Sequence, residues 1–517
     1  MPASRSTPVG LVTAVFLGTF MALLDLSVVN VALPAVQSDL DARLADVQWI
    51  VDGYALGLSA FMLTGGALGD RFGRKKTFLT GLTIFTLASL ACALAPTPGA
   101  LIAARLAQGI GASAITPGAL SLLAQGFPDP ARRARIIGLW GAVTALAVVL
   151  GPLLGGALTD TFGWPAIFLI NLPLGALALI VGLRGIEESA DPDHAATDPL
   201  GQLLAVLWLA ALTYAVIDAG HHGWTQPRVL TFFGIAAVAF LLFLLAERRS
   251  DRALLPLTLF RDRSFALVNT ASLILGFGAY GTFYLLSLYL QQVQDTSAVM
   301  TGVKFLPYSI AIALASTQAG RLTATFGPRR SMLAGYGLIT LGLLALLTLT
   351  PGTPYAWIAI VFTILGTGMG LAITPTNAAA LAAVPRQRSG AAAATVNATR
   401  QTGTALGIAL LGSLLTTRAT TALAHDLPTG SVTAHAEHQT ARALIDSQGR
   451  PWDGLPLEPG TAHDLFAHAF TDGLRLAVLI AGTITLAATA AVAFLNPTNA
   501  SQPAANSSPT SQPAPRS

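Results

Sequence analysis

Charged residues are scarce in this sequence, and their scarcity limits the classes of protein that it can encode. Asp, Glu, Lys and Arg together make up only 10% of the 517 residues, whereas 53% are hydrophobic. A soluble globular protein carries about 25% charged residues, which cover its surface in water. We therefore exclude an ordinary soluble protein and predict a membrane protein.

Cysteine and lysine are almost absent as well. Cys92 is the only cysteine, so no disulfide framework can form, and its apolar surroundings predict an unreactive thiol. The formal net charge is nevertheless +4, and most of the basic residues are arginines. These arginines are spread over short segments between apolar runs and form no single patch. We therefore attribute them to membrane topology and expect no nucleic-acid partner.

Apolar runs long enough to cross a bilayer, about 20 residues each, recur along the chain. The first run is too long for a signal peptide and contains Asp25, so we interpret it as a retained helix. We predict fourteen spans, near residues 10–33, 48–69, 77–95, 99–124, 136–158, 166–183, 201–219, 229–246, 265–290, 301–320, 331–350, 355–382, 391–415 and 473–495.

The distribution of basic residues predicts the orientation of these spans. With the N-terminus in the cytoplasm, most Lys and Arg residues fall on the cytoplasmic side, as the positive-inside rule requires. The opposite side receives only Arg43, Arg228, Arg418, Arg442 and Arg450. Because an even number of spans returns the chain to its starting side, we predict a multi-pass protein of the cell (inner) membrane with both termini cytoplasmic.

An eleven-residue pattern occurs twice, as GALGDRFGRKK at 66–76 and GRLTATFGPRR at 320–330. The copies follow spans two and ten, and such internal duplication is typical of secondary transporters. Because the second copy follows span ten rather than span nine, we interpret spans seven and eight as an insertion.

The predicted fold is therefore an all-α polytopic membrane protein with two six-helix bundles and two inserted helices. The predicted parts are an N-terminal bundle (1–185), the inserted pair (186–263), a C-terminal bundle (264–496) with a long extracellular loop (418–471), and a disordered cytoplasmic tail (497–517).

Two charged residues interrupt spans at a similar predicted depth. Asp25 lies about 12 Å below the outer surface if its helix ends near residue 33, and Arg105 lies about six residues below the outer end of span four. Charges inside the membrane are rare and mark functional sites. We predict that Asp25 and Arg105 face a shared cavity and handle protons, with Asp52 of span two as a further member. The alternatives are structural hydrogen bonds and an arginine that reaches toward the surface.

Two glycine-containing segments predict moving parts. The inner end of span two carries a carboxylate beside two basic residues, with a glycine on each side: Asp70, Arg71 and Arg74, with Gly66 and Gly73. This arrangement predicts a latch that holds one conformation. The alternative is that Asp70 is a solvated loop charge. In span five, GPLLGG contains a kinking proline and a face without side chains. We predict a hinge or sliding surface there, formed by Gly151, Pro152, Gly155 and Gly156.

Further polar and aromatic residues are candidates for a substrate cavity. Phe277, Tyr280 and Tyr284 recur at helical spacing in span nine, and Arg400 and Gln401 lie within span thirteen. Packing against neighbouring helices explains the aromatic residues equally well. The histidines of the segment 418–471 have no accompanying cysteine or fixed carboxylate framework, so we predict no metal site.

The chain resembles the major facilitator superfamily, in particular its fourteen-span drug:proton antiporters. The resemblance covers most of the chain through LDLSVVNVALP, GALGDRFGRKK, RLAQGIGAS, GPLLGG, WPAIFLINLPLG, YLQQV and RQTGTALGIALLG. The basic loop is shared by the whole superfamily, whereas the Gly-Pro helix of span five marks export by antiport. The resemblance implies that Asp25 is a coupling carboxylate, that Arg105 assists proton transfer and that the Asp70 loop controls alternating access.

We therefore predict a proton-coupled secondary transporter that exports small lipophilic or antibiotic-like compounds by antiport and alternating access. We expect a monomer in the lipid bilayer, driven by the proton gradient without a cofactor and without enzymatic activity. An uptake symporter for a small nutrient is the alternative within transport. A non-transporting polytopic membrane enzyme or sensor is the alternative from another class.

Overall fold

Long helices that run roughly parallel build the molecule. The computed structural model describes residues 8–127, 129–190, 198–250, 255, 257–384, 389–427, 434–450 and 458–494. The N-terminal part of the chain forms α1 (Pro8–Asp39), α2 (Leu44–Phe72), α3 (Arg74–Ala93), α4 (Pro98–Gly126), α5 (Pro130–Phe162), α6 (Ala166–Leu169) and α7 (Asn171–Gly185). The inserted pair is α8 (Pro199–His222) and α9 (Pro227–Arg249).

The C-terminal part begins with a short 3₁₀ turn, η1 (Leu257–Arg261). It continues with α10 (Arg263–Leu275), η2 (Gly276–Tyr280), α11 (Gly281–Leu288), η3 (Tyr289–Val293), α12 (Ala298–Lys304), α13 (Leu306–Ala345), η4 (Leu346–Thr348), α14 (Tyr355–Ala382), α15 (Ser389–Asp426), α16 (Ala434–Asp446) and α17 (Pro459–Ala493). The turns η2 and η3 are π-helical, so the helix from α10 to η3 changes its register twice.

The number of membrane-length helices agrees with the sequence. Thirteen helices in the described ranges are long and apolar enough to span a bilayer, and one of these runs over 51 residues. Gly327 interrupts that long helix with φ 81° and ψ 160°, so it comprises two spans and the total is fourteen. The predicted all-α membrane fold is confirmed.

Local sequence signals explain where many of these helices begin. Pro98, Pro130 and Pro199 occupy first-turn positions, where the missing N–H costs no hydrogen bond. The residue before each proline accepts a hydrogen bond from the first turn, as Asp198 does from the Gly201 backbone N–H at 2.8 Å.

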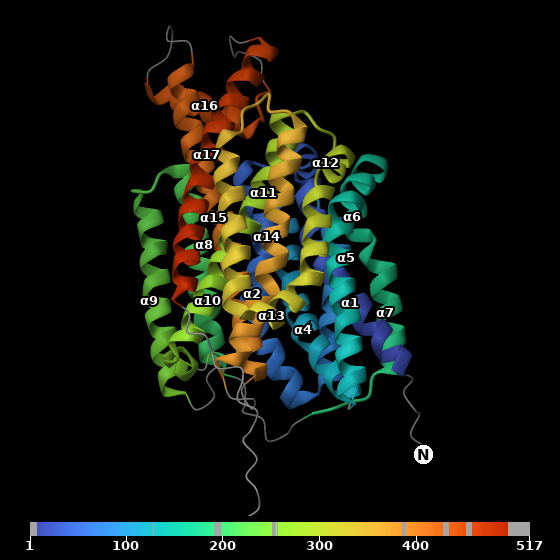
Figure 1. Ribbon diagram of the computed structural model, residues 1–517. Helices are drawn as coiled ribbons and strands as arrows, with labels where there is room; N and C mark the ends of the chain where they lie inside the picture. The colour runs from blue at the N-terminus through green and yellow to red at the C-terminus, as the bar shows by residue number, and fades with distance from the viewer. Residues whose placement is uncertain are drawn as a thin grey trace, which may run out of the picture.

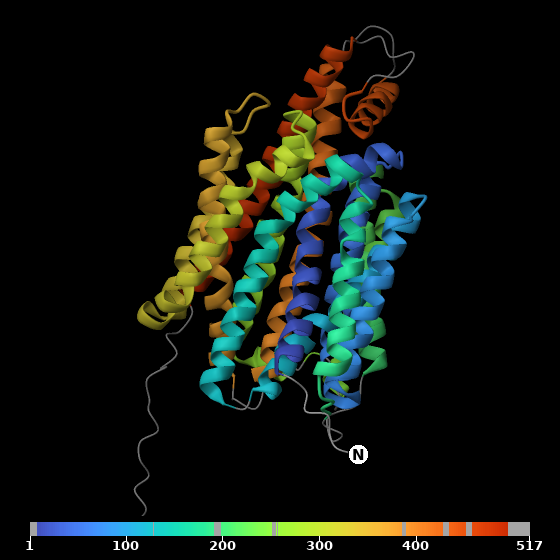
Figure 2. The same ribbon diagram turned by 90° about the vertical axis from the view of Figure 1, so that its right-hand side faces the viewer.

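The two bundles lie side by side, with the inserted pair along one edge. Figure 1 shows α8 and α9 in green beside the C-terminal helices, and Figure 2 shows the N-terminal helices (blue to cyan) next to the yellow-to-red C-terminal set. The inserted helix α8 packs on both α2 and α15. It therefore touches one helix of each bundle.

The end of the molecule that was predicted to lie outside differs in detail from the prediction. Helix α1 continues to Asp39, beyond the expected end near residue 33. The predicted loop 418–471 contains the end of α15, the helix α16 and the start of α17, while 428–433 and 451–457 lie outside the described residues, as does the predicted tail. In α16, the buried position of Asp446 raises the pKa of its carboxyl, and its backbone carbonyl accepts a hydrogen bond from Gln37 at 3.2 Å.

Glycines let α2 and α4 approach until their backbones touch. A Cβ on Gly57 would lie 2.6 Å from the carbonyl oxygen of Leu106, and one on Gly109 would lie 2.3 Å from that of Tyr54. Backbone atoms cannot yield as a flexible side chain can. The spacing of these two helices therefore depends on the missing side chains.

We expect the substitution Gly109→Ala to push α2 and α4 apart and to lower stability by about 1–3 kcal/mol, as overpacking does. The matched control is Gly337→Ala in α13, where a Cβ would meet no atom within 4 Å. Thermal unfolding of both variants in detergent, followed by tryptophan fluorescence, compares them. Equal melting temperatures would show that the α2–α4 contact is not tight.

Candidate functional site

A buried ion pair lies at the centre of the N-terminal bundle. Arg105 of α4 donates through Nη1 to a carboxylate oxygen of Asp25 on α1. The same nitrogen donates to Oε1 of Gln108 at 2.6 Å, and Gln108 Nε2 donates to the other Asp25 oxygen at 2.8 Å. The exposed fractions of the Arg105 and Asp25 side chains are 1% and 0%. Two opposite charges are thus held together away from water.

Two more helices contribute to this network. Asn171, the first residue of α7, donates through Nδ2 to Asp25 at 3.3 Å and to Ser89 Oγ at 3.3 Å. Ser89 of α3 also accepts from Gln108 Nε2 at 2.8 Å. The Asp25 carboxylate therefore accepts hydrogen bonds from three side chains, and the network joins α1, α3, α4 and α7.

Arg105 also contacts α2. Its Nε donates to the carbonyl oxygen of Ile50 at 3.1 Å, and its guanidinium carbon lies 4.4 Å from the ring centroid of Tyr54. The Tyr54 hydroxyl in turn donates to the carbonyl oxygen of Ala22 at 2.9 Å. A delocalised cation over an aromatic face gains further electrostatic stabilisation. These contacts hold the arginine in place independently of the carboxylate.

The sequence predicted Asp25 and Arg105 to face a shared cavity, and the structure brings them into direct contact instead. Gln108 was recognisable on the same helical face as Arg105. Ser89 and Asn171 were missed. The only sequence signal for Asn171 is an amide in the apolar run IFLINLPLG.

Asp52 lies apart from this network. It is completely buried, and neither of its carboxylate oxygens has a hydrogen-bond partner among the described residues. The Tyr284 side chain of α11 lies in its neighbourhood. Since Ile50 and Tyr54 face Arg105, Asp52 lies on a different face of α2. The two acids that were predicted to act together are separated by this helix.

The predicted latch forms a compact turn between α2 and α3. Arg74 Nη2 lies 2.6 Å from Asp70 Oδ1, and Gly73 has φ 117°. The Glu188 carboxylate accepts from the backbone N–H groups of Lys75 and Lys76 at 3.1 and 3.2 Å, so it caps the start of α3. Glu188 lies beyond α7 and was not predicted to belong to this site.

The remaining latch residues lie close to this turn. The guanidinium of Arg71 lies 5.3 Å from the ring centroid of Phe72, and Gly66 faces Pro117 of α4. In the second copy of the pattern, Gly327 has φ 81°, which matches the positive φ of Gly73. The repeat is therefore visible in the backbone, although the second copy has Ala324 in place of the latch carboxylate.

The predicted hinge in α5 packs against two helices through its glycines. A Cβ on Gly151 would collide with Ser27 of α1, and one on Gly155 would lie 2.7 Å from the Val28 carbonyl oxygen. On another side, a Cβ on Gly156 would lie 2.3 Å from the carbonyl oxygen of Ala298 in α12.

The contact between α5 and α12 is reciprocal. A Cβ on Gly302 of α12 would lie 2.3 Å from the carbonyl oxygen of Pro152. The motif thus connects the helix that carries Asp25 with the C-terminal bundle.

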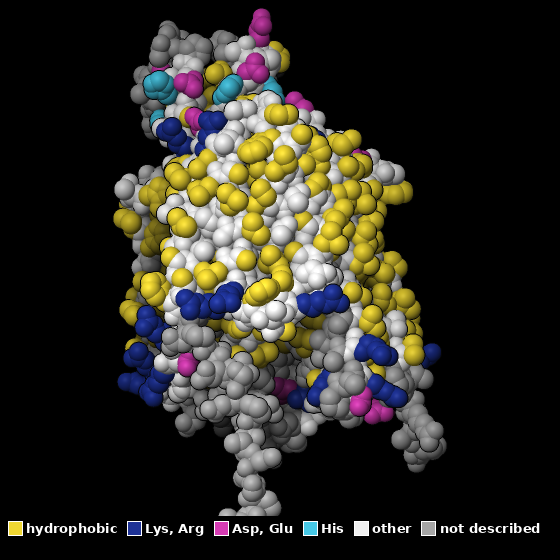
Figure 3. Space-filling view, viewed as in Figure 1, with side chains coloured by type: hydrophobic (Ala, Val, Ile, Leu, Met, Phe, Trp, Pro, Cys, Tyr) yellow, Lys and Arg dark blue, Asp and Glu magenta, His cyan; other side chains and the backbone are white. Residues whose placement is uncertain are grey.

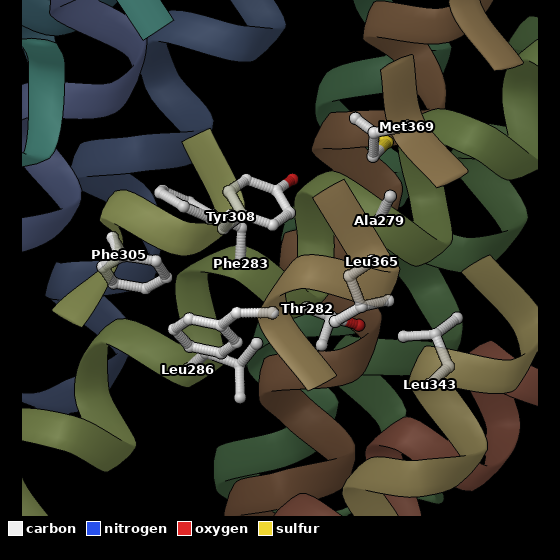
Figure 4. Close-up of a pocket in the computed structure, with 10 residues that line it drawn as sticks. Ala279, Thr282, Phe283, Leu286, Phe305, Tyr308, Leu343, Leu365 and Met369 are labelled. Carbon is white, nitrogen blue, oxygen red and sulfur yellow. The ribbon is translucent and has the colours of Figure 1, made fainter. Parts of the chain in front are cut away.

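Aromatic residues of the C-terminal bundle surround a small pocket. Figure 4 shows Phe283, Phe305 and Tyr308 around a pocket of only about 10 Å³. The predicted Phe277 and Tyr284 are buried and, like Tyr280, do not line it. The π-helical turn η2 alters the helical register at this point, so spacing in the sequence misjudges which side chains share a face.

The other predicted cavity residues lie on α15. Arg400 donates through Nη2 to Asn397 Oδ1, and its Nη1 has no partner among the described residues. Gln401 is half-buried beside it. Within the described ranges, no three His, Cys, Asp or Glu side chains are grouped in a way that could hold a metal ion.

This combination of fourteen membrane-length helices and a buried charged network defines a multi-pass membrane transporter. The chain belongs to the Major Facilitator Superfamily, whose model matches residues 15–408. Membership makes it a transporter rather than an enzyme.

Comparisons with individual proteins agree with this family. The chain is 38% identical to "Multidrug resistance protein Stp" of Mycobacterium tuberculosis over 93% of its own length and 89% of the relative. It is 32% identical to "Tetracenomycin C resistance and export protein" of Streptomyces glaucescens over 95% and 93%. A crystal structure of a bacterial homologue of the human lysosomal transporter Spinster matches with a TM-score of 0.62, 17% identity, and coverage of 95% and 97%. That similarity shows the fold alone.

We expect Arg105→Gln to destabilise the protein by about 3–5 kcal/mol, because it leaves the Asp25 charge buried without a cation. The double variant Asp25→Asn with Arg105→Gln should recover part of this loss, since no lone charge remains. Melting temperatures in detergent measure both.

The control for this substitution is Arg475→Gln, which removes the partly exposed pair with Asp472. It should cost about 0–1 kcal/mol. A double variant less stable than Arg105→Gln alone would contradict our account of the ion pair.

Proposed function

We propose that this protein exports small lipophilic, antibiotic-like compounds in exchange for protons. The observation that carries the proposal is the buried pair of Asp25 and Arg105, because a carboxylate beside a permanent cation inside a membrane protein forms a switch that one proton on the carboxylate can reset. The names of the relatives favour export over uptake, since they describe drug resistance and export. No cofactor is required if the proton gradient supplies the free energy.

In the proposed cycle, a proton from outside neutralises Asp25. The neutral carboxyl no longer attracts the guanidinium of Arg105, which keeps Gln108, the Ile50 carbonyl and the Tyr54 ring as partners. Helix α1 is then free to shift against α5, where Gly151 and Gly155 leave a smooth surface. Loss of the proton to the cytoplasm restores the ion pair.

The contacts between the bundles support alternating access. Ser287 of α11 donates to the Asn30 carbonyl oxygen at 2.7 Å, and Gln292 donates to Gln37 at 3.1 Å. The Val299 backbone N–H donates to Asp160 at 3.0 Å. All three join the outer ends of helices, so this conformation fits an outer side closed and an inner side ready to receive substrate.

The proposed setting is the cytoplasmic membrane, with both termini inside and the transporter acting as a monomer. Figure 3 shows Lys and Arg side chains in a band at the lower end, an apolar belt above it, and His and acidic side chains at the upper end. The positive-inside rule assigns the lower end to the cytoplasm.

We expect Asp25→Asn to abolish proton-driven efflux, because asparagine cannot release a proton. Its amide oxygen can still accept from Gln108 and Asn171, and Arg105 keeps Gln108 and the Ile50 carbonyl as partners, so the protein should stay folded but with a lower melting temperature. The assay uses inverted vesicles with an acidic interior and a pH-sensitive dye, to which lipophilic cations and antibiotics are added. Recovery of the dye signal should occur with wild type and with the control Asp472→Asn. Equal recovery in Asp25→Asn would remove Asp25 from the mechanism.

A second expectation concerns the closed outer side. Cysteines in place of Asp160 and Val299, in a Cys92→Ala background, should form a disulfide between α5 and α12 under mild oxidation and stop transport. Reduction should restore it, and each single cysteine variant should be unaffected. Full transport by the bridged protein would contradict opening at this contact.

A further inference from the structure

The outer ends of α2, α8 and α9 enclose a polar cavity of about 300 Å³. Its lining includes Trp49 of α2 and Asp218 and His221 of α8. His221 is buried, and its Nε2 has no partner among the described residues. None of the predicted site residues belongs to this cavity.

Charged groups from four helices surround it. Arg43 lies 3.3 Å from Asp46, and Arg228 lies 3.8 Å from Asp218, whose other oxygen is 2.9 Å from His222. Arg442 of α16 is close enough to act electrostatically on His221 and on Asp218. Three of the five arginines that the topology assigns to the outer side therefore meet at one place. The titratable and charged groups that face His221 are Arg43, Asp46, Asp218, His222, Arg228 and Arg442.

Below the cavity, buried polar atoms without partners continue inward. Both amide atoms of Gln48, the hydroxyl of Thr213, both oxygens of Asp52 and the hydroxyl of Tyr284 lack hydrogen-bond partners in the described part of the chain. Gln48, Thr213 and Asp52 are 0% exposed and Tyr284 is 1% exposed. Such atoms are rare in folded proteins, where a partner or an ordered water normally satisfies them.

The helix geometry places Asp52 and Thr213 on facing surfaces at the same depth. On α2, Trp49 and Leu56 pack against α8, and Asp52 falls between them at helical spacing. On α8, Leu209 and Ile217 pack against α2 and α15, and Thr213 lies between these two. The chain of α2 leads inward from Arg43 at the cavity, whereas the chain of α8 leads outward and reaches the cavity at His221. Asp52 and Thr213 therefore both lie about 12–14 Å below the cavity.

Helix α15 packs against the third side of these buried polar groups of α2 and α8. Ser413 Oγ donates to the Val216 carbonyl oxygen of α8 at 2.6 Å, and a Cβ on Gly412 would collide with the amide of Gln48. The missing side chain at Gly412 leaves room for the Gln48 amide between α2 and α15.

We propose that α2, α8 and α15 form a hydrated path along which protons from outside reach Asp52. This inference rests on the proposed proton antiport and gives Asp52, on the side of α2 away from Asp25, an entry route of its own along the inserted helix α8. A proton taken up from outside water at the cavity moves along waters hydrogen-bonded to Gln48 and Thr213. It then binds a carboxylate oxygen of Asp52, which loses its negative charge. Water is expected where several buried polar atoms converge.

The first test measures hydration without relying on transport. In a Cys92→Ala background, Thr213→Cys should react with Ag⁺ added from outside to intact cells, because a thiol in contact with water binds this small cation. Ala215→Cys is the matched control, since Ala215 is also 0% exposed and lies on the same helix. Reaction at 213 and not at 215 is expected. Equal, negligible reaction at both positions would overturn the proposal.

The second test measures proton use in inverted vesicles. Thr213→Val keeps the shape of the side chain but removes the hydroxyl, so we expect proton-driven efflux to slow by about tenfold. Substrate exchange without a proton gradient should be unchanged, and Thr213→Ser should behave as wild type. If the hydroxyl were dry, Thr213→Val would instead raise stability and leave efflux unchanged, which would also overturn the proposal.

These outcomes separate this inference from the proposed function. If wild type shows no substrate-induced proton movement, the antiport proposal fails, and the entry path fails with it. If wild type exchanges protons but Thr213→Val does so at the same rate, only the entry path fails. Loss of folding in Thr213→Val would be recognised by its melting temperature, and the reaction of Thr213→Cys with Ag⁺ would then decide.

Discussion

The ion pair between Asp25 and Arg105 sets the arrangement of the N-terminal bundle. A guanidinium that is 1% exposed has lost its hydration, and an uncompensated charge there would cost several kcal/mol. Its compensation comes from α1 through Asp25, from its own helix through Gln108 and from α2 through the Ile50 carbonyl. Because Asp25 also accepts a hydrogen bond from Asn171 on α7, these helices cannot slide along one another without breaking hydrogen bonds to the buried charges. The ion pair thus fixes the positions of the helices in this bundle relative to one another.

Glycines make this arrangement sterically possible. Gly57 and Gly109 bring α2 and α4 together, so that the Tyr54 ring and the Ile50 carbonyl reach Arg105. The same principle operates in α5, where Gly151 and Gly155 touch α1 within three residues of Asp25. Gly156, a further glycine of α5, contacts α12 of the C-terminal bundle. In the proposed mechanism, a change at Asp25 therefore reaches the interface between the bundles through one intervening helix.

The sequence predicted the parts of this site that carry charge and missed the neutral Ser89 and Asn171. Asp25 and Arg105 stand out because charges within spans are rare, and the fourteen spans stand out because a bilayer demands about 20 apolar residues. Direct contact between Asp25 and Arg105 was not predictable, since α1 extends to Asp39 and the depth of Asp25 depends on that end.

Ser89 and Asn171 were not predictable either. Neutral polar residues in membrane helices usually bond to their own backbone, as Thr83 and Thr86 do here. The shared face expected for the aromatic positions of span nine could not be predicted reliably, because π-helical turns change the spacing from which a shared face is inferred.

Helix α2 separates two acids with different electrostatic partners. Asp25 faces the Arg105 cation, whereas neither carboxylate oxygen of Asp52 has a hydrogen-bond partner among the described residues. In the proposed mechanism, a proton on Asp25 dissolves the ion pair and loosens α1 from α4. In the proposed entry path, a proton on Asp52 removes an isolated charge from the region between α2 and α8, and so favours closer packing there. In the proposed mechanism both events act on α2, and their order determines whether α2 moves with its own bundle or with the C-terminal bundle.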